Sequence, residues 1–288
     1  MQLLLGTAQW GWNTPAAEAF RLLDTWLAAG HRQLDCATNY PINRNPADFR
    51  AAEKLLLEYI RAHGLHDLRL TMKVGSLDNL RGPDINLNPS FVLMMGEEYL
   101  RLFGQNLQTL MLHWDNRDSA SDIRATLQAL LTLREQYGLQ PGLSGIAHPS
   151  AYVAANADLG LDFNIQLKHN VFQSQLSHYD PMRAAGQHRF FAYGINGGGV
   201  KLASDYSVDS TYLTRGGQPE QVAGQVQHLR DMLPRWNTAF VRPPVKTMNH
   251  LGLIGAGLHP QLNGIVLGAS SGAQLRETLD FLPVVVAR

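Results

Sequence analysis

Short apolar runs alternate with amphipathic segments along most of the chain. Each run leads into polar or glycine-rich residues, as strands do before loops. The predicted strands span residues 3–6, 33–35, 69–73, 109–113, 142–144, 163–166, 190–193 and 264–267. Between them lie helical patterns, several of which begin with proline or a capping residue. The predicted helices span residues 15–29, 46–62, 89–103, 119–137 and 272–282.

This order of elements predicts one architecture. Strands that alternate with helices of ten or more residues indicate βαβ units and a parallel sheet in the α/β class. Eight of them predict a single (β/α)8 TIM barrel that takes up residues 1–288 as one domain. A long insertion, residues 194–263, separates the last two strands and is expected to contain helices at 218–233 and 238–256. Because it leaves from the rim where barrel enzymes carry their chemistry, we expect it to cover the site.

The composition favours a small-molecule partner. Hydrophobic residues make up 45% of the 288, enough for a large core. Lysine plus arginine balances aspartate plus glutamate at 24 each, so no net charge attracts nucleic acid or an anionic membrane. The single cysteine, Cys36, excludes an intramolecular disulfide framework, and no apolar run is long enough for a signal peptide or a membrane span. We therefore expect a cytoplasmic protein; no oligomeric state is indicated.

Four titratable side chains are expected to meet at the barrel rim. Asp35, Lys73 and His113 end predicted strands, and Tyr40 lies five positions beyond Asp35. Because the carboxyl ends of parallel barrel strands share one rim, these groups predict an acid/base site. A buried ammonium needs a counter-charge, which Asp35 supplies, although a purely structural ion pair explains Asp35 and Lys73 equally well. We expect the lysine charge to lower the pKa of Tyr40, and His113 to hydrogen-bond a substrate oxygen.

Together these residues resemble the aldo-keto reductase superfamily. The resemblance runs in order along the chain. Its first half comprises a glycine motif at 6–11, an Asp-Thr-Ala-x-x-Tyr signature at 35–40, a strand lysine at 72–74 and a His-x-Asp turn at 112–115. Its second half comprises a Gly-x-Ser-Asn motif at 142–145, a Gln-x-x-x-Asn motif at 164–170, an Ala-Tyr pair at 192–193 and an adenosine-end motif at 268–275. The sequence departs from that pattern at Pro41, at Lys168 and His169, and at Gly145, which replaces the asparagine that holds the nicotinamide carboxamide. It also lacks the family's frequent N-terminal hairpin and long C-terminal tail, which implies an open site.

The resemblance implies hydride transfer between a nicotinamide and a carbonyl carbon, without a metal. Tyr40 would protonate the developing alkoxide. Lys73 and Asp35 would tune Tyr40, and His113 would orient the carbonyl. NADPH is the expected cofactor, with NADH as the alternative, and a glycine run at 197–199 would approach its pyrophosphate. The implied cofactor-binding residues are Gly6, Thr7, Ala8, Ser144, Gln166, Tyr193, Gly268, Ser270, Ser271 and Gln274.

The substrate and two competing functions are left open. Trp10, Trp12 and Trp114 fall at predicted loops or strand ends, where they would line a pocket for a carbonyl or sugar-like compound or simply plug the barrel mouth. The first competing function is a regulatory subunit that binds the nicotinamide cofactor with little turnover. The second is an aldolase in which Lys73 forms a Schiff base.

Overall fold

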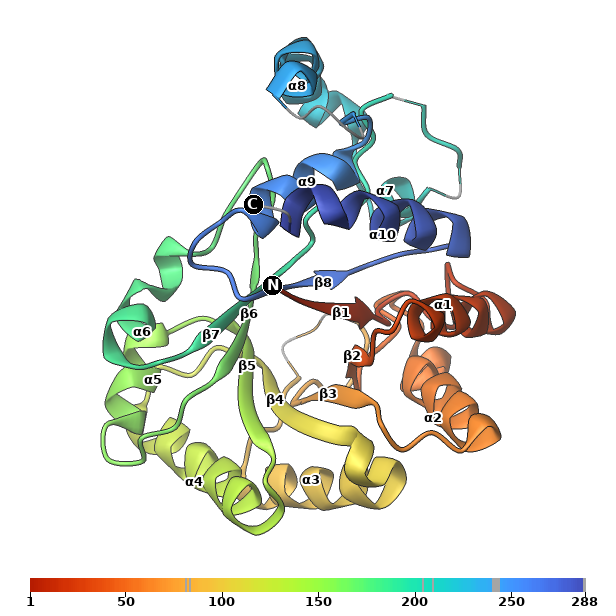
Figure 1. Cartoon of the computed structure of the whole chain (residues 1–288). Helices are drawn as coiled ribbons and strands as arrows, with labels where there is room; N and C mark the ends of the chain where they lie inside the picture. The colour runs from red at the N-terminus through yellow and green to blue at the C-terminus, as the bar shows by residue number, and fades with distance from the viewer. Residues whose placement is uncertain (81, 83, 204, 209, 240–243, 287–288) are drawn as a thin grey trace.

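Eight parallel strands close into a barrel (Figure 1). The computed structural model describes the chain except residues 81, 83, 204, 209, 240–243 and 287–288. Neighbouring strands pair in sequence order, and β8 pairs with β1 to complete the cylinder. The strands are β1 (Gln2–Gly6), β2 (Gln33–Ala37), β3 (Arg69–Val74), β4 (Leu107–Asp115), β5 (Gln140–Ile146), β6 (Asn164–Lys168), β7 (Arg189–Tyr193) and β8 (Gly264–Leu267). All eight predicted strands and the (β/α)8 barrel are confirmed.

Helices alternate with the strands and surround the barrel (Figure 1). The α-helices are α1 (Ala16–Ala28), α2 (Ala51–His63), α3 (Pro89–Phe103), α4 (Ala120–Tyr137), α5 (Pro149–Asn156), α6 (Asp180–Ala185), α7 (Thr211–Thr214), α8 (Pro219–Ala239), α9 (Met248–Gly257) and α10 (Gly272–Val286). Three short 3₁₀ helices are η1 (Pro46–Asp48), η2 (Gly104–Asn106) and η3 (Ser177–Tyr179). The sequence pattern does not predict α5, α6 or α7, because helices this short show too few turns for a helical repeat.

Two predicted helices are wrong at their boundaries. The helix over 46–62 is interrupted, because Arg50 adopts a left-handed conformation (φ 65°) that separates η1 from α2. The helix over 238–256 is wrong in its first part, since α8 runs on to Ala239 and α9 begins only at Met248. There Thr247 Oγ1 accepts a hydrogen bond from the His250 amide (3.2 Å) and caps α9. Residues 240–243 of that prediction lie outside the described residues.

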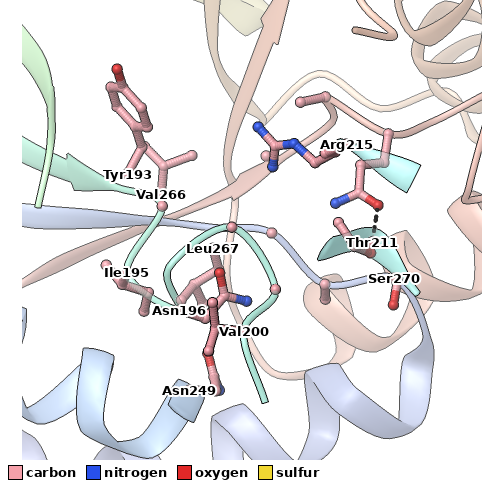
Figure 2. Close-up of a pocket in the computed structure, with 18 of the residues that line it drawn as sticks. Tyr193, Ile195, Asn196, Val200, Thr211, Arg215, Asn249, Val266, Leu267 and Ser270 are labelled. Carbon is pink, nitrogen blue, oxygen red and sulfur yellow. Dashed lines mark hydrogen bonds between the residues drawn. The ribbon is translucent and has the colours of Figure 1, made fainter. Parts of the chain in front are cut away.

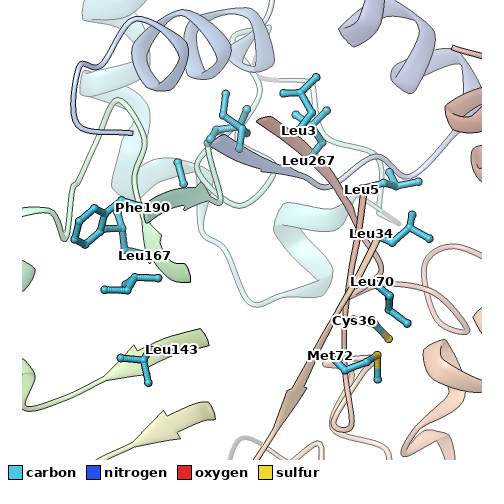
Figure 3. Close-up of a cluster of buried hydrophobic side chains, with 14 of the residues drawn as sticks. Leu3, Leu5, Leu34, Cys36, Leu70, Met72, Leu143, Leu167, Phe190 and Leu267 are labelled. Carbon is cyan, nitrogen blue, oxygen red and sulfur yellow. The ribbon is translucent and has the colours of Figure 1, made fainter. Parts of the chain in front are cut away.

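The alternation of side chains along each strand brings the polar residues into the barrel. In β2, Leu34 and Cys36 belong to the apolar core that packs between the barrel and its helices, so Asp35 between them faces inward. Figure 3 shows Leu34 and Cys36 together with their counterparts from other strands. By the same alternation the inward-facing residues of the other strands include Lys73, His113, Ser144, Gln166, Lys168 and Tyr193.

The segment between β7 and β8 reaches the barrel mouth through its shortest helix. Two hydrogen bonds tie α7 to the loop after β1: Thr211 Oγ1 donates to Gln9 Oε1 (3.2 Å), and Asn13 Nδ2 donates to Thr214 Oγ1 (2.9 Å). The long helix α8 lies at the outer end of the molecule, away from the barrel (Figure 1). The segment therefore lies over the barrel mouth at α7, while α8 extends outward.

Candidate active site

A cavity of about 740 Å³ opens at the carboxyl ends of the strands, a volume typical of ligand sites. Its walls come from the strand ends and from the segment that follows β7. Figure 2 shows part of this wall, with Tyr193, Arg215 and Ser270 among the residues around it. Asp35, Tyr40 and His113 line the same cavity. The structure therefore brings the residues of the predicted acid/base site to the predicted rim.

Asp35 and Lys73 form an ion pair at the cavity wall. They are 2% and 1% exposed, and the Lys73 ammonium donates a hydrogen bond to Asp35 Oδ2. Gln166 joins the pair, because its Oε1 accepts from Lys73 Nζ (3.3 Å) and its Nε2 donates to Asp35 Oδ1 (2.5 Å). Charges buried this deeply require such partners, so the three side chains hold one another in a fixed arrangement.

The phenol of Tyr40 lies beside this ion pair. Lys73 Nζ is 4.9 Å from the centroid of the Tyr40 ring. Burial raises the pKa of Tyr40 to about 12, although the positive charge of Lys73 acts in the opposite direction. The expectation of a lowered pKa is therefore wrong, because desolvation of the phenolate outweighs the attraction of one ammonium. Tyr40 is consequently protonated at neutral pH and can act as a proton donor.

His113 completes the group as a neutral imidazole. It is 4% exposed, and its ring lies 6.2 Å from the Tyr40 ring at an interplanar angle of 89°. Burial, followed by the charge of Lys73, holds the pKa of His113 well below its usual range. Its Nδ1 has no hydrogen-bond partner among the described residues. A neutral ring that is not engaged by the protein can hydrogen-bond a substrate oxygen.

Gly145 departs from the family pattern because Trp114 occupies the space beside it. Both residues have left-handed backbone conformations, with φ of 68° at Gly145 and 61° at Trp114. A Cβ atom on Gly145 would lie 2.3 Å from Trp114 Cδ1, far inside van der Waals contact. The Trp114 ring also lies 4.7 Å from that of His113, and Trp114 lines the cavity. The indole has therefore taken the place that an asparagine side chain would need.

Most of the predicted cofactor residues reach the cavity. Those that line it are Gly6, Ala8, Ser144, Gln166, Tyr193, Gly268, Ser270 and Gln274. Thr7 and Ser271 do not, and both bond within the protein. Thr7 Oγ1 donates to the Asp35 carbonyl (3.1 Å), and Ser271 Oγ accepts from the Gln274 amide (3.2 Å). These two residues therefore support the wall from behind.

Gln166 and the first turn of α10 already have protein partners. Both ends of the Gln166 amide bond to the Asp35–Lys73 pair, so Gln166 holds the acid/base group as well as facing the cavity. At the start of α10, the Gly272 amide donates to the Glu18 carboxylate (2.7 Å). A carboxylate at a helix N-terminus repels a phosphate. The first amide of α10 is therefore not free to bind a cofactor phosphate.

The three tryptophans that were predicted to line the pocket lie in different environments. Only Trp114 lines the cavity. Trp10 is fully buried in the core, and its indole nitrogen has no hydrogen-bond partner among the described residues. Trp12 is half-buried and does not line the cavity. The substrate-pocket role predicted for Trp10 and Trp12 is therefore not supported, because the loop after β1 turns Trp10 into the core.

Several residues that the structure brings to the cavity were assigned no cavity role from the sequence. They include Asn196, Arg215 and Lys246 from the segment after β7, and Lys168 at the end of β6. The alternation Gln166, Leu167, Lys168 was a usable signal, because it places Lys168 on the same face as Gln166. For Arg215 the only signal was its position in a long insertion that leaves from the catalytic rim.

Comparison with known proteins agrees with the fold. A family model described as the aldo/keto reductase family matches residues 2–285, nearly the whole chain. No curated protein gave a significant match. Within the described part of the chain, no helix is long and apolar enough to cross a membrane, and no group of three or more His, Cys, Asp or Glu could hold a metal ion. The chain belongs to the aldo/keto reductase family, whose members are oxidoreductases that act on small carbonyl compounds.

Proposed function

We propose that the protein reduces an aldehyde or a ketone with NAD(P)H, or oxidises the corresponding alcohol or sugar, with Tyr40 as the general acid. The observation that carries this proposal is a protonated phenol and a neutral imidazole on the cavity wall, with a paired ammonium beside the phenol. A bound nicotinamide supplies the hydride. The residues of the chain supply orientation and the proton.

The proton comes from the Tyr40 hydroxyl. As negative charge develops on a carbonyl oxygen in the cavity, Tyr40 transfers its proton to that oxygen and becomes a phenolate. The Lys73 ammonium beside the ring stabilises this phenolate, and Asp35 holds Lys73 in place. A general acid positioned to protonate the developing alkoxide typically accelerates the reaction by roughly 10²–10⁴-fold. His113 would orient the carbonyl oxygen through a hydrogen bond, which needs no charge on the ring.

Three groups fit a nicotinamide dinucleotide. Ser144 lines the cavity, and its hydroxyl makes no hydrogen bond with another described residue, so it can bond a carboxamide. Tyr193 lies next to Lys168 in the sheet register and offers an aromatic face for stacking. Gly198 lines the cavity with open space at its Cα (φ 80°), which lets the backbone approach a phosphate closely.

We propose NADPH over NADH as the cofactor. Lys246 lines the cavity on the side of Ser270 and Gln274, where it would offer a positive charge to the 2′-phosphate. Glu277 lines the same cavity, and its Oε1 lies 3.3 Å from His250 Nε2. Burial lowers the pKa of His250, so the ring beside the Glu277 carboxylate is neutral at pH 7.

Cofactor titration and turnover together test the proposed function. Tryptophan fluorescence is followed on addition of NADPH and of NADH, and oxidation of NADPH is then measured with aldehydes, ketones and keto sugars. We expect quenching by NADPH and turnover of at least one carbonyl class. Quenching without turnover on any class would favour a regulatory subunit, and the absence of both would refute the proposed function.

The structure disfavours the aldolase alternative. A Schiff base requires a neutral amine, and burial alone would favour one at Lys73. The neighbouring Asp35 carboxylate and Tyr40 outweigh burial and hold the pKa of Lys73 above its usual value. We therefore expect borohydride to trap no carbonyl compound on Lys73, as judged by the mass of the intact protein.

A further inference from the structure

Two cationic side chains face the cavity beside the acid/base group. Lys168 is the last residue of β6, and it pairs in register with Tyr193 of β7. Arg215 directly follows α7. Both line the cavity together with Tyr40 and Tyr193, and Figure 2 shows Arg215 and Tyr193 on the same cavity. Neither cation belongs to the network of Asp35, Lys73 and Gln166.

Among the described residues, neither cation has a carboxylate partner. No ion pair involves Lys168 or Arg215, and neither side-chain head group makes a hydrogen bond with another described residue. Of the two carboxylates that line the cavity, Asp35 pairs with Lys73, and Glu277 lies on α10 next to His250. Two cations without an anionic partner among the described residues therefore line the same cavity.

Lys168 is half-buried and Arg215 reaches solvent, so water screens only part of the repulsion between the two charges. Burial lowers the pKa of Lys168, and the charge of Arg215 lowers it further. Burial also lowers the pKa of Arg215, although the nearby Tyr40 and Tyr193 act in the opposite direction. A bound anion would offset the partial desolvation of Lys168 and the mutual repulsion of the two cations.

Arg215 is held in this position by the backbone around it. Its amide donates to the Thr211 carbonyl (3.3 Å), and Thr211 is tied to Gln9 by the hydrogen bond marked in Figure 2. Thr214, the neighbour of Arg215, is tied to Asn13 (2.9 Å). The backbone at Arg215 is thus anchored to the loop after β1.

The position of Lys168 separates this pair from the groups that fit the cofactor phosphates. β7 lies between β6 and β8, so Lys168 is on one side of Tyr193 while Ser270 and Gln274, which follow β8, are on the other. Gly198 follows β7 on the chain and is separate from β6. An anion bonded to both cations would lie beside Tyr40 and Tyr193, which line the same cavity and act on the charge of Arg215.

We propose that Lys168 and Arg215 form an anion subsite that selects carbonyl substrates carrying a carboxylate or phosphate group. The subsite rests on the proposed reductase function and deepens it by naming the substrate class. The arginine fork can bind either group through two hydrogen bonds, and the lysine adds a point charge. A neutral carbonyl compound of the same shape would leave both cations without a partner.

A matched pair of substrates tests the subsite. At neutral pH 4-carboxybenzaldehyde is an anion, whereas its methyl ester has the same ring and aldehyde without the charge. We expect wild type to favour the carboxylate in kcat/KM, and we expect Arg215→Gln and Lys168→Gln each to reduce this preference by roughly 10- to 100-fold, the value of a hydrogen bond to a charged group. Lys201→Gln is the control, because Lys201 also lines the cavity but donates to the Asp205 carbonyl (2.8 Å). It should leave the preference unchanged.

Two further measurements make every outcome decisive. The dissociation constant of NADPH, measured by tryptophan fluorescence, should not change in Arg215→Gln or Lys168→Gln. A weaker NADPH complex, with equal losses of kcat/KM for both aldehydes, would assign the cations to the cofactor and overturn the subsite. Equilibrium binding of 4-carboxybenzaldehyde needs no turnover. Equal affinity of wild type for this aldehyde and its ester would overturn the subsite even if the reductase function stands. Selective binding of the carboxylate without turnover would support the subsite and count against the function.

Discussion

Replacing Gly145 by alanine should disturb the fold and the site together. The new Cβ would lie 2.3 Å from Trp114 Cδ1, where carbon atoms at rest are separated by about 3.5–4.0 Å. The indole must therefore move, and it lies between Gly145 and His113 on the cavity wall. The backbone must also keep φ near 68° with a side chain attached.

The expected cost has two parts. A left-handed residue other than glycine costs about 1–2 kcal/mol. Overpacking a well-filled site costs typically about 1–3 kcal/mol more. We therefore expect Gly145→Ala to lower the free energy of unfolding by about 2–5 kcal/mol. Only the second part depends on Trp114.

A double-mutant cycle separates the two parts. Urea denaturation of wild type, Gly145→Ala, Trp114→Ala and the double variant gives the coupling energy between the two positions. We expect a coupling of about 1–3 kcal/mol, because Trp114→Ala removes the clash but leaves the backbone strain. Additive effects within about 0.5 kcal/mol would show that Trp114 does not fill the space beside Gly145, and would refute this explanation of the missing asparagine.

Three other changes have defined outcomes. Lys73→Met should cost about 3–5 kcal/mol in urea denaturation, because it leaves the buried Asp35 carboxylate without its cation; an effect near zero would mean that Asp35 finds another partner. The pKa of His113 is held below its ordinary value of 6.5, so the unfolded chain binds more protons below that pH, and stability is lost as the pH falls through about 6.5. His113→Asn should therefore make the loss of stability with falling pH shallower, by at most about 1.4 kcal/mol per pH unit, and an unchanged slope would contradict a neutral buried ring. Thr211→Val breaks the bond to Gln9 and should raise KM for the carbonyl substrate with little change in melting temperature, whereas an unchanged KM would show that α7 is held by other contacts.

The barrel could be read from the sequence because its signal is repeated. Each strand carries alternating apolar residues that pack on the helices, and the residue between them faces inward, as Leu34, Asp35 and Cys36 do. The positions of Asp35, Lys73 and His113 at the ends of predicted strands indicated that they would share one rim. Whether these side chains lie together depends on the order and register of the strands. Eight similar strand–helix units determine both, because each strand pairs with the next one in the sequence.

The electrostatics of the site could not be read in this way. The sequence shows that Tyr40 lies near Lys73, but the sign of its pKa shift depends on how deeply the phenol is buried. Burial is set by the walls that close around it, and those walls include residues of the long insertion. The contact between Gly145 and Trp114 is hidden for the same reason, since it depends on two left-handed residues on adjacent strands.

Element boundaries failed where a local feature overrides the apolar pattern. Arg50 is neither glycine nor proline, so the sequence pattern does not indicate that the predicted helix is interrupted there, before α2. In the insertion, α9 begins only where Thr247 provides a cap, and the apolar Val245 just before it is not helical.

The most direct measurement is the turnover number of Tyr40→Phe beside its affinity for NADPH. Phenylalanine keeps the ring against Lys73 and His113 but removes the proton. We expect kcat for carbonyl reduction to fall by roughly 10²–10⁴-fold while the dissociation constant of NADPH stays close to that of wild type. A folded Tyr40→Phe protein that binds NADPH and turns over at the wild-type rate would contradict Tyr40 as the proton donor.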